Sequence, residues 1–183
     1  MTAHLSICTM SQEPRRAWVF GDNLDTDALA PGQYMKLSLP ELATHCLEGV
    51  RPEFASQVRP GDIVVAGRNF GCGSSREQAP QALLQLGVAC LIAPSFAGLF
   101  HRNALNLGLP ALVCAEASSI QQDDQLAWDA ATGRITNHTQ DRTLQAAPIP
   151  AFLLEMLAAG GLMPHLEAQL KARTYPKRKP PHD

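Results

Sequence analysis

Continuous apolar runs alternate with segments of helical periodicity over the first two thirds of the chain. Such runs predict strands that are buried on both faces, and they cover residues 17–20, 62–66, 87–93 and 109–114. Apolar positions spaced three and four residues apart predict helices over residues 38–50, 78–86 and 95–108. Because strands and helices alternate, the order predicts parallel strands joined by right-handed crossovers.

Local signals at the ends refine these helices. Ser38 is expected to cap the first helix, with Pro40 and Glu41 in its first turn. Ser95 is expected to cap the third helix and Gly108 to end it. The positions expected to face the core are Leu42, Cys46, Leu47, Ala79, Leu83, Leu84, Leu86, Phe96, Leu99, Phe100 and Leu105.

The pattern changes after the fourth strand. Residues 125–145 carry the turn signals Ala-Thr-Gly and Asn-His-Thr between short runs, which predicts an antiparallel hairpin or meander. Residues 149–173 predict a helix, a break at two glycines and a short helical end. We expect an α/β domain with a mostly parallel sheet and an antiparallel hairpin region. Its divisions are a loose leader (1–14), the domain (15–170) and a basic, proline-rich tail (171–183).

Composition agrees with one globular domain. The chain has 183 residues, of which 45% are apolar and 17% charged, enough to bury a substantial core. A formal net charge of −2 gives no general attraction for nucleic acid. The basic residues from Lys171 onward are typical of a solvated tail.

Cysteine usage indicates a reducing compartment. The five cysteines are odd in number and have no C-x-x-C spacing, which argues against a disulfide framework and against a zinc site. The first residues lack the apolar stretch of a signal peptide, and no later run has the roughly 18 apolar residues of a membrane span. We expect a soluble cytoplasmic protein.

The stretch GRNFGCGSSREQAP (67–80) carries the main candidate chemistry. Its glycines allow a tight turn, and a helix is expected to begin at about Ser75 with Ser74 as its N-cap. The free N–H groups of a helix start attract a carboxylate or phosphate, and Arg76 can grip the same anion with two hydrogen bonds. The turn therefore predicts an anion site.

Two rival structures would use the same residues of this stretch. In a capping box, Ser74 caps the helix and Glu77 bonds back to its N–H, which needs no ligand. A phosphate-binding P-loop is disfavoured, because the stretch lacks the Gly-Lys-Ser/Thr ending.

Three blocks of the sequence together resemble a known family. They are GDNLDTDALAPGQYM (21–35), RPEFASQVRPGDIVVAGRNFGCGSSREQAP (51–80) and IAPSFAGLFHRNALNLGLP (92–110). Their order and spacing are similar to those of the small subunit of 3-isopropylmalate dehydratase, in the aconitase superfamily. The resemblance is strong over residues 18–112 and weaker to about residue 170. It implies a three-layer β/β/α swivelling domain, like that of aconitase.

The resemblance also implies a partner and a reaction. In this family a large subunit holds a [4Fe–4S] cluster on three cysteines, and the small subunit binds no metal. The heterodimeric hydro-lyase converts 2-isopropylmalate to 3-isopropylmalate in leucine biosynthesis, by dehydration and rehydration. Cys72 alone cannot hold a cluster, so we expect it to have a structural role.

The family pattern implies roles for the motif residues. Ser74 matches the catalytic base, Arg76 a contact to a substrate carboxylate, and Ser75 a member of the same anion pocket. Glu77 is expected to orient the turn. Asp27 matches an aspartate that holds catalytic groups in position, although an ordinary Asx turn would also account for it.

Substrate choice is implied to depend on the segment Tyr34, Met35, Lys36 and Leu37. An arginine at position 36 would suit an additional carboxylate, whereas a fully apolar segment would suit an isopropyl group. Lys36 between apolar neighbours is a hybrid, and we favour an apolar side group. Gln78 also departs from the family, which usually has histidine there.

Alternatives to this function therefore stay open. A related hydratase of the homoaconitase, citraconate or dimethylmalate type would use the same motifs. A non-catalytic anion-binding module would use the same turn. RNA binding is disfavoured by the acidic body of the chain.

Overall fold

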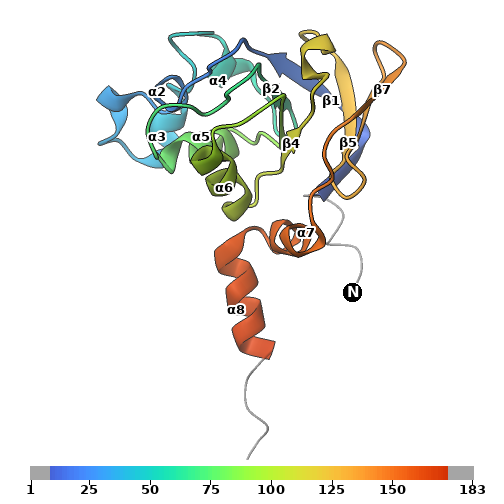
Figure 1. The fold of residues 1–183 in the computed structure, drawn as a ribbon. Coiled ribbons are helices and arrows are strands. Elements are labelled where there is room, and N and C mark those ends of the chain that lie inside the picture. The colour runs from blue at the N-terminus through green and yellow to red at the C-terminus, as the bar shows by residue number, and fades with distance from the viewer. Residues whose placement is uncertain (1–8, 173–183) are drawn as a thin grey trace, which may run out of the picture.

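The computed structural model describes residues 9–172 and is built on one seven-stranded sheet (Figure 1). The strands are β1 (Met10–Val19), β2 (Ile63–Val65), β3 (Cys90–Ala93), β4 (Ala111–Val113), β5 (Gln125–Asp129), β6 (Arg134–Asn137) and β7 (Arg142–Gln145). Their order in the sheet is β4-β3-β2-β1-β5-β6-β7. The pairs β1–β2, β2–β3 and β3–β4 are parallel. The pairs β1–β5, β5–β6 and β6–β7 are antiparallel. The sheet is thus mixed in equal parts rather than mostly parallel.

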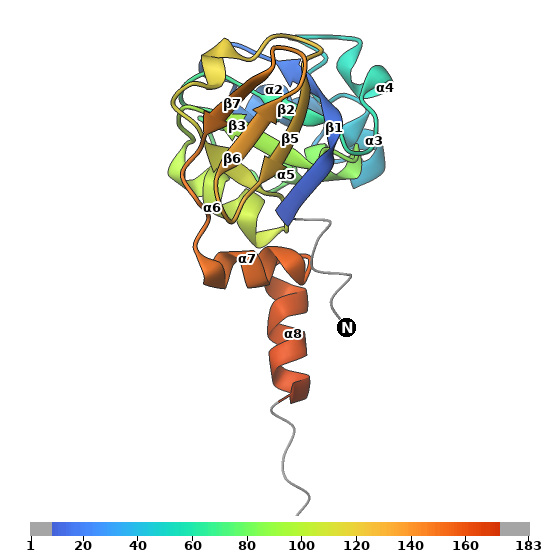
Figure 2. The ribbon, with the colours of Figure 1, turned by 90° about the vertical axis from the view of Figure 1, so that its right-hand side faces the viewer.

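The parallel strands are buried on both faces, as their continuous apolar runs predict. On one face Val64 and Leu91 pack in a core that includes Leu83 and Phe100 from the helices. On the other face the partners come from the antiparallel half of the sheet, including Leu126, Ile135 and Leu144. The sheet curls so that β5 to β7 lie across the parallel strands (Figure 2). Helices, parallel strands and antiparallel strands therefore form three layers, which confirms the expected β/β/α architecture.

Most helices are short. They are α2 (Thr26–Leu29), α3 (Leu39–Ala43), α4 (Phe54–Gln57), α5 (Gln78–Gln85), α6 (Gly98–Asn106), α7 (Ala151–Ala158) and α8 (Leu162–Ala172), with 3₁₀ turns η1 (Gly32–Tyr34) and η2 (Ala117–Ser119). Within residues 9–172, no helix has the length and apolar character that crossing a lipid bilayer requires.

The helix predicted over residues 38–50 is shorter than expected. Its start is correct, because the N–H of Ser38 donates to Glu41 Oε2 at 3.1 Å. The α-helix ends at Ala43, because the next three N–H groups bond three residues back rather than four. The turns then stop at Leu47, which has a φ of +63° and donates its N–H to the carbonyl of Ala28 at 2.8 Å. A tertiary hydrogen bond thus replaces the helical one.

The helix predicted from Ser95 begins later, at Gly98. The Ser95 hydroxyl does not cap it, because this oxygen accepts the N–H of Asn69 at 2.9 Å. Leu99, predicted to face the core, is 40% exposed, whereas Phe100 and Leu105 are buried as expected.

Both ends of the domain differ from the prediction. Strand β1 begins at Met10, because Met10 and Ser11 pair with Asp129 and Trp128 of β5. Residues 10–14 of the expected leader are therefore part of the sheet, and residues 1–8 lie outside the described range.

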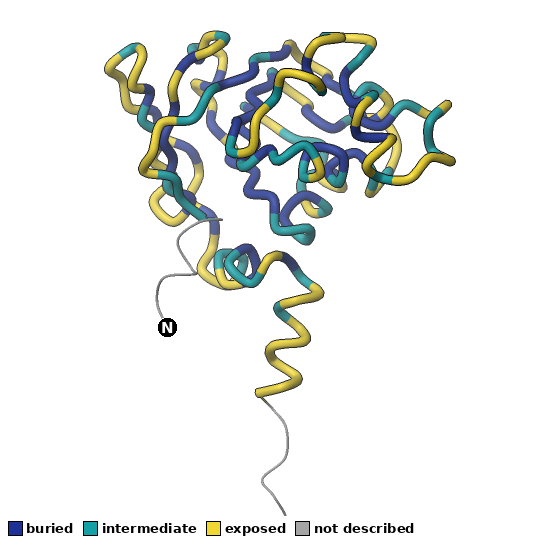
Figure 3. The backbone as a smooth tube through the Cα atoms, turned by 180° about the vertical axis from the view of Figure 1, so that it is seen from behind, coloured by how far each residue is buried: buried dark blue, intermediate teal, exposed yellow. Residues whose placement is uncertain are grey.

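At the carboxyl end, the predicted break at Gly160 and Gly161 is confirmed. Helix α8 is longer than the expected helical end. It projects from the body and is exposed along most of its length (Figures 1 and 3). The first residues of the expected tail are helical, and residues 173–183 lie outside the described range.

Candidate active site

Three loops meet at the carboxyl ends of neighbouring parallel strands. They are residues 21–27 after β1, residues 67–77 after β2 and residues 94–97 after β3. We call the first the aspartate loop and the second the serine turn. The N–H of Asn23 donates to the carbonyl of Arg68 at 2.8 Å, and the N–H of Phe70 donates to the carbonyl of Ser95 at 3.0 Å. Open α/β sheets bind ligands at this end of their strands, which makes this edge the candidate site.

Ser74 lies exposed on the serine turn, with its hydroxyl beside that of Thr26. The two hydroxyl oxygens are 3.2 Å apart, and the N–H of Ser74 donates to Thr26 Oγ1 at 3.0 Å. Either hydroxyl can be the donor of the bond between them, because each has one proton and two lone pairs. Thr26 therefore fixes the serine turn through contacts with both the N–H and the hydroxyl of Ser74.

Thr26 was not among the residues singled out by the sequence motifs. It is buried, 2% exposed, and its N–H donates to the carbonyl of Cys72 at 2.8 Å. Its partners lie in a distant part of the chain, so no local pattern indicates the contact. Its place beside Asp27 in the GDNLDTD block was the available signal.

The predicted helix start at Ser75 is wrong. Helix α5 begins at Gln78, and Glu77 occupies its N-cap position without a side-chain capping bond. The capping box between Ser74 and Glu77 is therefore absent, because Ser74 is bound to Thr26 instead. Since the field of a helix dipole acts mainly within its first turn, it is weaker at Ser74 than the sequence suggested.

Arg76 joins the serine turn to the aspartate loop. Its Nη1 forms an ion pair with Asp27 Oδ1 and donates to the carbonyl of Ala30 at 2.9 Å. Asp27 Oδ1 also accepts the N–H of Gly32 at 3.1 Å. The hydrogen bond from Arg76, followed by that from Gly32, holds the pKa of Asp27 below its usual value. Asp27 and Arg76, which the sequence analysis singled out separately, thus form a pair on the same edge as Ser74.

The serine turn borders an open hollow of about 500 Å³. Its lining is polar, and consists of Ser74, Ser75, Arg76, Glu77, Gln78 and Gln81. Ser75, which was predicted to belong to an anion pocket, is one of the lining residues. Gln78, the departure from the family pattern, lines the same hollow.

Gly71 is required for the tight approach of these loops. Its φ of +78° is unfavourable for other residues, and a Cβ atom here would collide with the Phe100 ring. Its N–H donates to the carbonyl of Leu24 at 2.7 Å. The glycine thus lets the serine turn contact both the aspartate loop and α6.

The substrate segment, which we define as Tyr34 to Leu37, is divided between inward and outward side chains. Tyr34 and Met35 pack against the helix-side core, whereas Lys36 and Leu37 are exposed. The segment begins at the last residue of the 3₁₀ turn η1, whose Gly32 contacts Asp27. It is therefore connected to the Asp27–Arg76 pair through the backbone.

The described residues do not fit an iron-sulfur cluster. Within residues 9–172, no three His, Cys, Asp or Glu side chains are placed to hold a metal ion. Cys46 and Cys90 lie in the cores, where burial raises the pKa of their thiols. Cys72 is in the serine turn, with its thiol 3.5 Å from the carbonyl of Asn23. Its bonds to the aspartate loop support the structural role that we expected.

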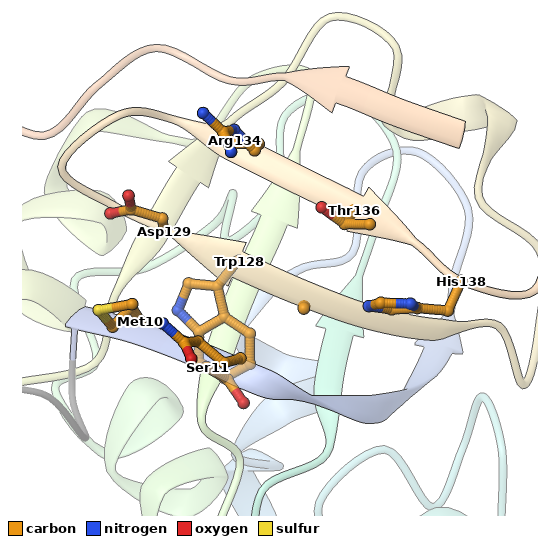
Figure 4. Close-up of a pocket in the computed structure, with 9 residues that line it drawn as sticks. Met10, Ser11, Trp128, Asp129, Arg134, Thr136 and His138 are labelled. Atoms are coloured by element: carbon orange, nitrogen blue, oxygen red, sulfur yellow. The ribbon is translucent and has the colours of Figure 1, made fainter. Parts of the chain in front are cut away.

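Another hollow, of about 300 Å³, lies over β1, β5 and β6 (Figure 4). The register of β1 against β5 shifts between Ser11 and Arg15 near this place. Asp129, one of its lining residues, accepts the N–H of Ala131 at 2.9 Å and the hydroxyl of Thr132 at 2.8 Å. The Asp129 carboxylate therefore holds the turn between β5 and β6.

Comparison with known proteins relates the chain to one enzyme superfamily. The model of the aconitase C-terminal domain family matches residues 44–117. The 3-isopropylmalate dehydratase small subunit of Methanosarcina mazei is 50% identical over 159 residues, which cover 86% of this chain and 98% of that protein. The methanogen homoaconitase small subunit of Methanothermobacter thermautotrophicus is 52% identical over 151 residues, which cover 82% of this chain and 88% of that protein.

A solved structure extends the likeness to three dimensions. The crystal structure of 3-isopropylmalate dehydratase from Methanocaldococcus jannaschii has a TM-score of 0.83 and 39% sequence identity. The match covers 88% of this chain and 96% of that one. The chain therefore belongs to the family of 3-isopropylmalate dehydratase small subunits, within the aconitase superfamily.

Proposed function

We propose that the chain is the small subunit of a heterodimeric hydro-lyase that isomerises 2-isopropylmalate to 3-isopropylmalate, a step of leucine biosynthesis. The observation that carries this proposal is one exposed turn on which Ser74 is paired with Thr26 and Arg76 with Asp27, in a chain of this family. The chain works in the cytoplasm, in keeping with the free cysteines at positions 46, 72, 90 and 114.

A large subunit completes the site, and the chain alone is inactive. The hollow beside Ser74 is open, so a second surface is needed to exclude water from the reaction. Relatives such as that of Methanosarcina mazei are named as small subunits, which supports a larger companion. A [4Fe–4S] cluster held by three cysteines of that companion would supply the Lewis acid that the departure of hydroxide requires.

Ser74 acts as the base. It removes the proton from the carbon next to a substrate carboxylate, and it returns a proton during rehydration. A free serine hydroxyl is too weakly acidic to exist as an alkoxide. Here the Thr26 hydroxyl, 3.2 Å away, and the positive charge of Arg76 lower the free energy of the anion.

Arg76 binds a substrate carboxylate. Its bonds to Asp27 and Ala30 are both made by Nη1, which leaves Nε and Nη2 for the fork that grips a carboxylate. Asp27 fixes the guanidinium in this orientation. Ser75 supplies a further hydroxyl in the same hollow.

The substrate side group is the least determined part of the proposal. Lys36 is exposed next to Met35 and Leu37, which suits either an apolar group or a further carboxylate. Relatives named for isopropylmalate and for homoaconitase are 50% and 52% identical to the chain, so overall identity favours neither. A homoaconitase-type substrate is therefore the second candidate.

The proposal is tested by reconstitution. The chain is co-expressed with candidate large subunits, and the complexes are assayed anaerobically for absorbance of the unsaturated intermediate. The panel holds 2-isopropylmalate, citramalate and homocitrate, and each subunit alone is a control. We expect turnover only in the complex, with 2-isopropylmalate preferred. Absence of turnover on every substrate, in complexes with an intact cluster, would contradict the proposal.

A further inference from the structure

The Tyr34 ring lies flat on the imidazole of His45. The ring centroids are 3.6 Å apart and the planes differ by 14°. His45 Nδ1 is in turn 2.7 Å from Glu48 Oε2, and the hydrogen bond from His45 holds the pKa of Glu48 below its usual value. A hydrogen bond with the Glu48 carboxylate raises the pKa of the Tyr34 hydroxyl. We call these three residues the His45 clamp.

The substrate segment has a second anchor on its other side. The N–H of Gly32 donates to Asp27 Oδ1 at 3.1 Å, so η1 is attached to the Asp27–Arg76 pair. Between this anchor and the His45 clamp, the N–H of Tyr34 donates to the carbonyl of Pro31 at 2.9 Å. The chain between the two anchors is thus a hydrogen-bonded turn with little freedom.

The exposed part of the segment begins directly after the clamp. Met35 packs against the helix-side core, and Lys36 and Leu37 follow, with Leu37 42% exposed. The N–H of Leu37 donates to the carbonyl of Tyr34 at 2.9 Å, which extends the turn. The placement of Lys36 and Leu37 therefore depends on where the Tyr34 ring is held.

We propose that His45 is a positioning residue for substrate selection, because its stack with Tyr34 sets the position of Lys36 and Leu37. This inference rests on the proposed function, in which the substrate segment contacts the side group of the substrate. Proton removal depends on Ser74, which the His45 clamp does not contact. Loss of the stack therefore alters discrimination between side groups rather than the chemical step.

The first test uses the isolated chain and does not depend on activity. Hydrogen exchange of the Tyr34, Met35 and Leu37 amides is measured in wild type, His45→Ala, Tyr34→Ala and His45→Phe, with His165→Ala as a matched control on α8. Loss of an aromatic stack should raise the equilibrium constant for local opening of this turn by about two- to tenfold. We expect exchange to accelerate by that factor in His45→Ala and Tyr34→Ala, and to remain at the wild-type rate in His45→Phe and His165→Ala.

The second test uses the reconstituted complex. We expect His45→Ala to lower the ratio of kcat/KM for 2-isopropylmalate over citramalate by about three- to tenfold, mainly through KM. His45→Phe keeps an aromatic ring under Tyr34, so the ratio should return to that of wild type. The thermal unfolding midpoint of each variant reports whether its fold is intact.

The outcomes separate this inference from the proposed function. Inactive wild-type complexes would remove the proposed function, while the exchange rates would still report on the clamp. Unchanged exchange in both His45→Ala and Tyr34→Ala overturns the inference. Accelerated exchange with an unchanged selectivity ratio also overturns it, as does failure of His45→Phe to restore the ratio. If His45→Ala does not fold, Tyr34→Ala and His45→Phe supply the same comparison of exchange rates.

Discussion

The hydroxyl oxygens of Thr26 and Ser74 lie 3.2 Å apart, although 48 residues separate them in the sequence. This pair joins two loops that follow different strands. In the proposed mechanism the Thr26 hydroxyl is a fixed hydrogen-bond partner of the base. The Thr26–Ser74 contact is therefore the structural basis of the proposed chemistry.

Replacing Ser74 by alanine should remove the base without affecting the fold. Loss of a general base typically costs about 10²- to 10⁴-fold in rate, and we expect kcat of the reconstituted complex to fall in that range. The hydroxyl is exposed, so the thermal unfolding midpoint and binding of the large subunit should stay near wild type. Ser56→Ala on α4, whose hydroxyl contacts only its own turn, is the control. Wild-type turnover of Ser74→Ala would contradict the assignment.

Thr26→Val keeps the shape of the buried side chain and removes its hydroxyl. The Ser74 N–H and Ser74 Oγ both lose their partner, and the net loss of stability should be about 1 kcal/mol. We also expect a lower kcat, because the anion of Ser74 is less stabilised. Thr26→Ser restores the hydroxyl and should recover most of both losses. Urea unfolding and steady-state kinetics measure the two effects, and equal kcat for the valine and serine variants would exclude the role of Thr26.

Asp27→Asn should hold the Arg76 guanidinium less firmly and make the free energy of unfolding less dependent on pH in the acid range. The pKa of Asp27 is lowered in the folded chain, so its ion pair stabilises the fold above the usual aspartate pKa of about 3.9. This contribution is lost as the pH falls through the lower folded value. Because the Asp27 side chain is 65% exposed, solvent screening keeps the difference under about 1 kcal/mol.

The measurement for Asp27→Asn is urea unfolding at a series of pH values. The gap between wild type and variant should be constant near neutrality and should close below pH ~3.9. In the complex, KM should rise more than kcat falls, because Arg76 is held less firmly. A stability gap that stays the same down to strong acid would show that the pair is not formed.

Lys36→Arg should shift substrate preference toward a longer tricarboxylate. The planar guanidinium can grip an extra carboxylate with two hydrogen bonds, whereas the ammonium of lysine acts as a point charge. We expect the ratio of kcat/KM for homocitrate over 2-isopropylmalate to rise about tenfold, equivalent to roughly 1.4 kcal/mol. Lys36→Met is the matched control and should move the ratio in the opposite direction. No shift in either variant would mean that this segment does not select the substrate.

The strands were predictable because their signal is local. The runs around Val64 and Leu91 are apolar on both faces, and the curled sheet buries both faces of these strands between helices and antiparallel strands. The break at Gly160 was likewise visible in the sequence. In each case the residues that give the signal also determine the structure.

The incorrect helix-cap predictions concern side chains that bond to residues distant in the sequence. Ser74 and Ser95 both have the sequence context of a helix cap, yet their side chains bond to Thr26 and to the Asn69 N–H. Tertiary hydrogen bonds therefore override local capping preference at both places. The family resemblance named Asp27 and Arg76 separately, and their pairing was not predicted, since the spacing of residues in the sequence does not show which loops meet.

The bonds that unite the aspartate loop, the serine turn and the loop after β3 are all internal to this one polypeptide. These loops thus lose their conformational entropy when the polypeptide folds, and not when it meets a companion. In the proposed complex with a large subunit, this surface would already be shaped before assembly, so ordering of the three loops would not reduce the affinity of the two chains.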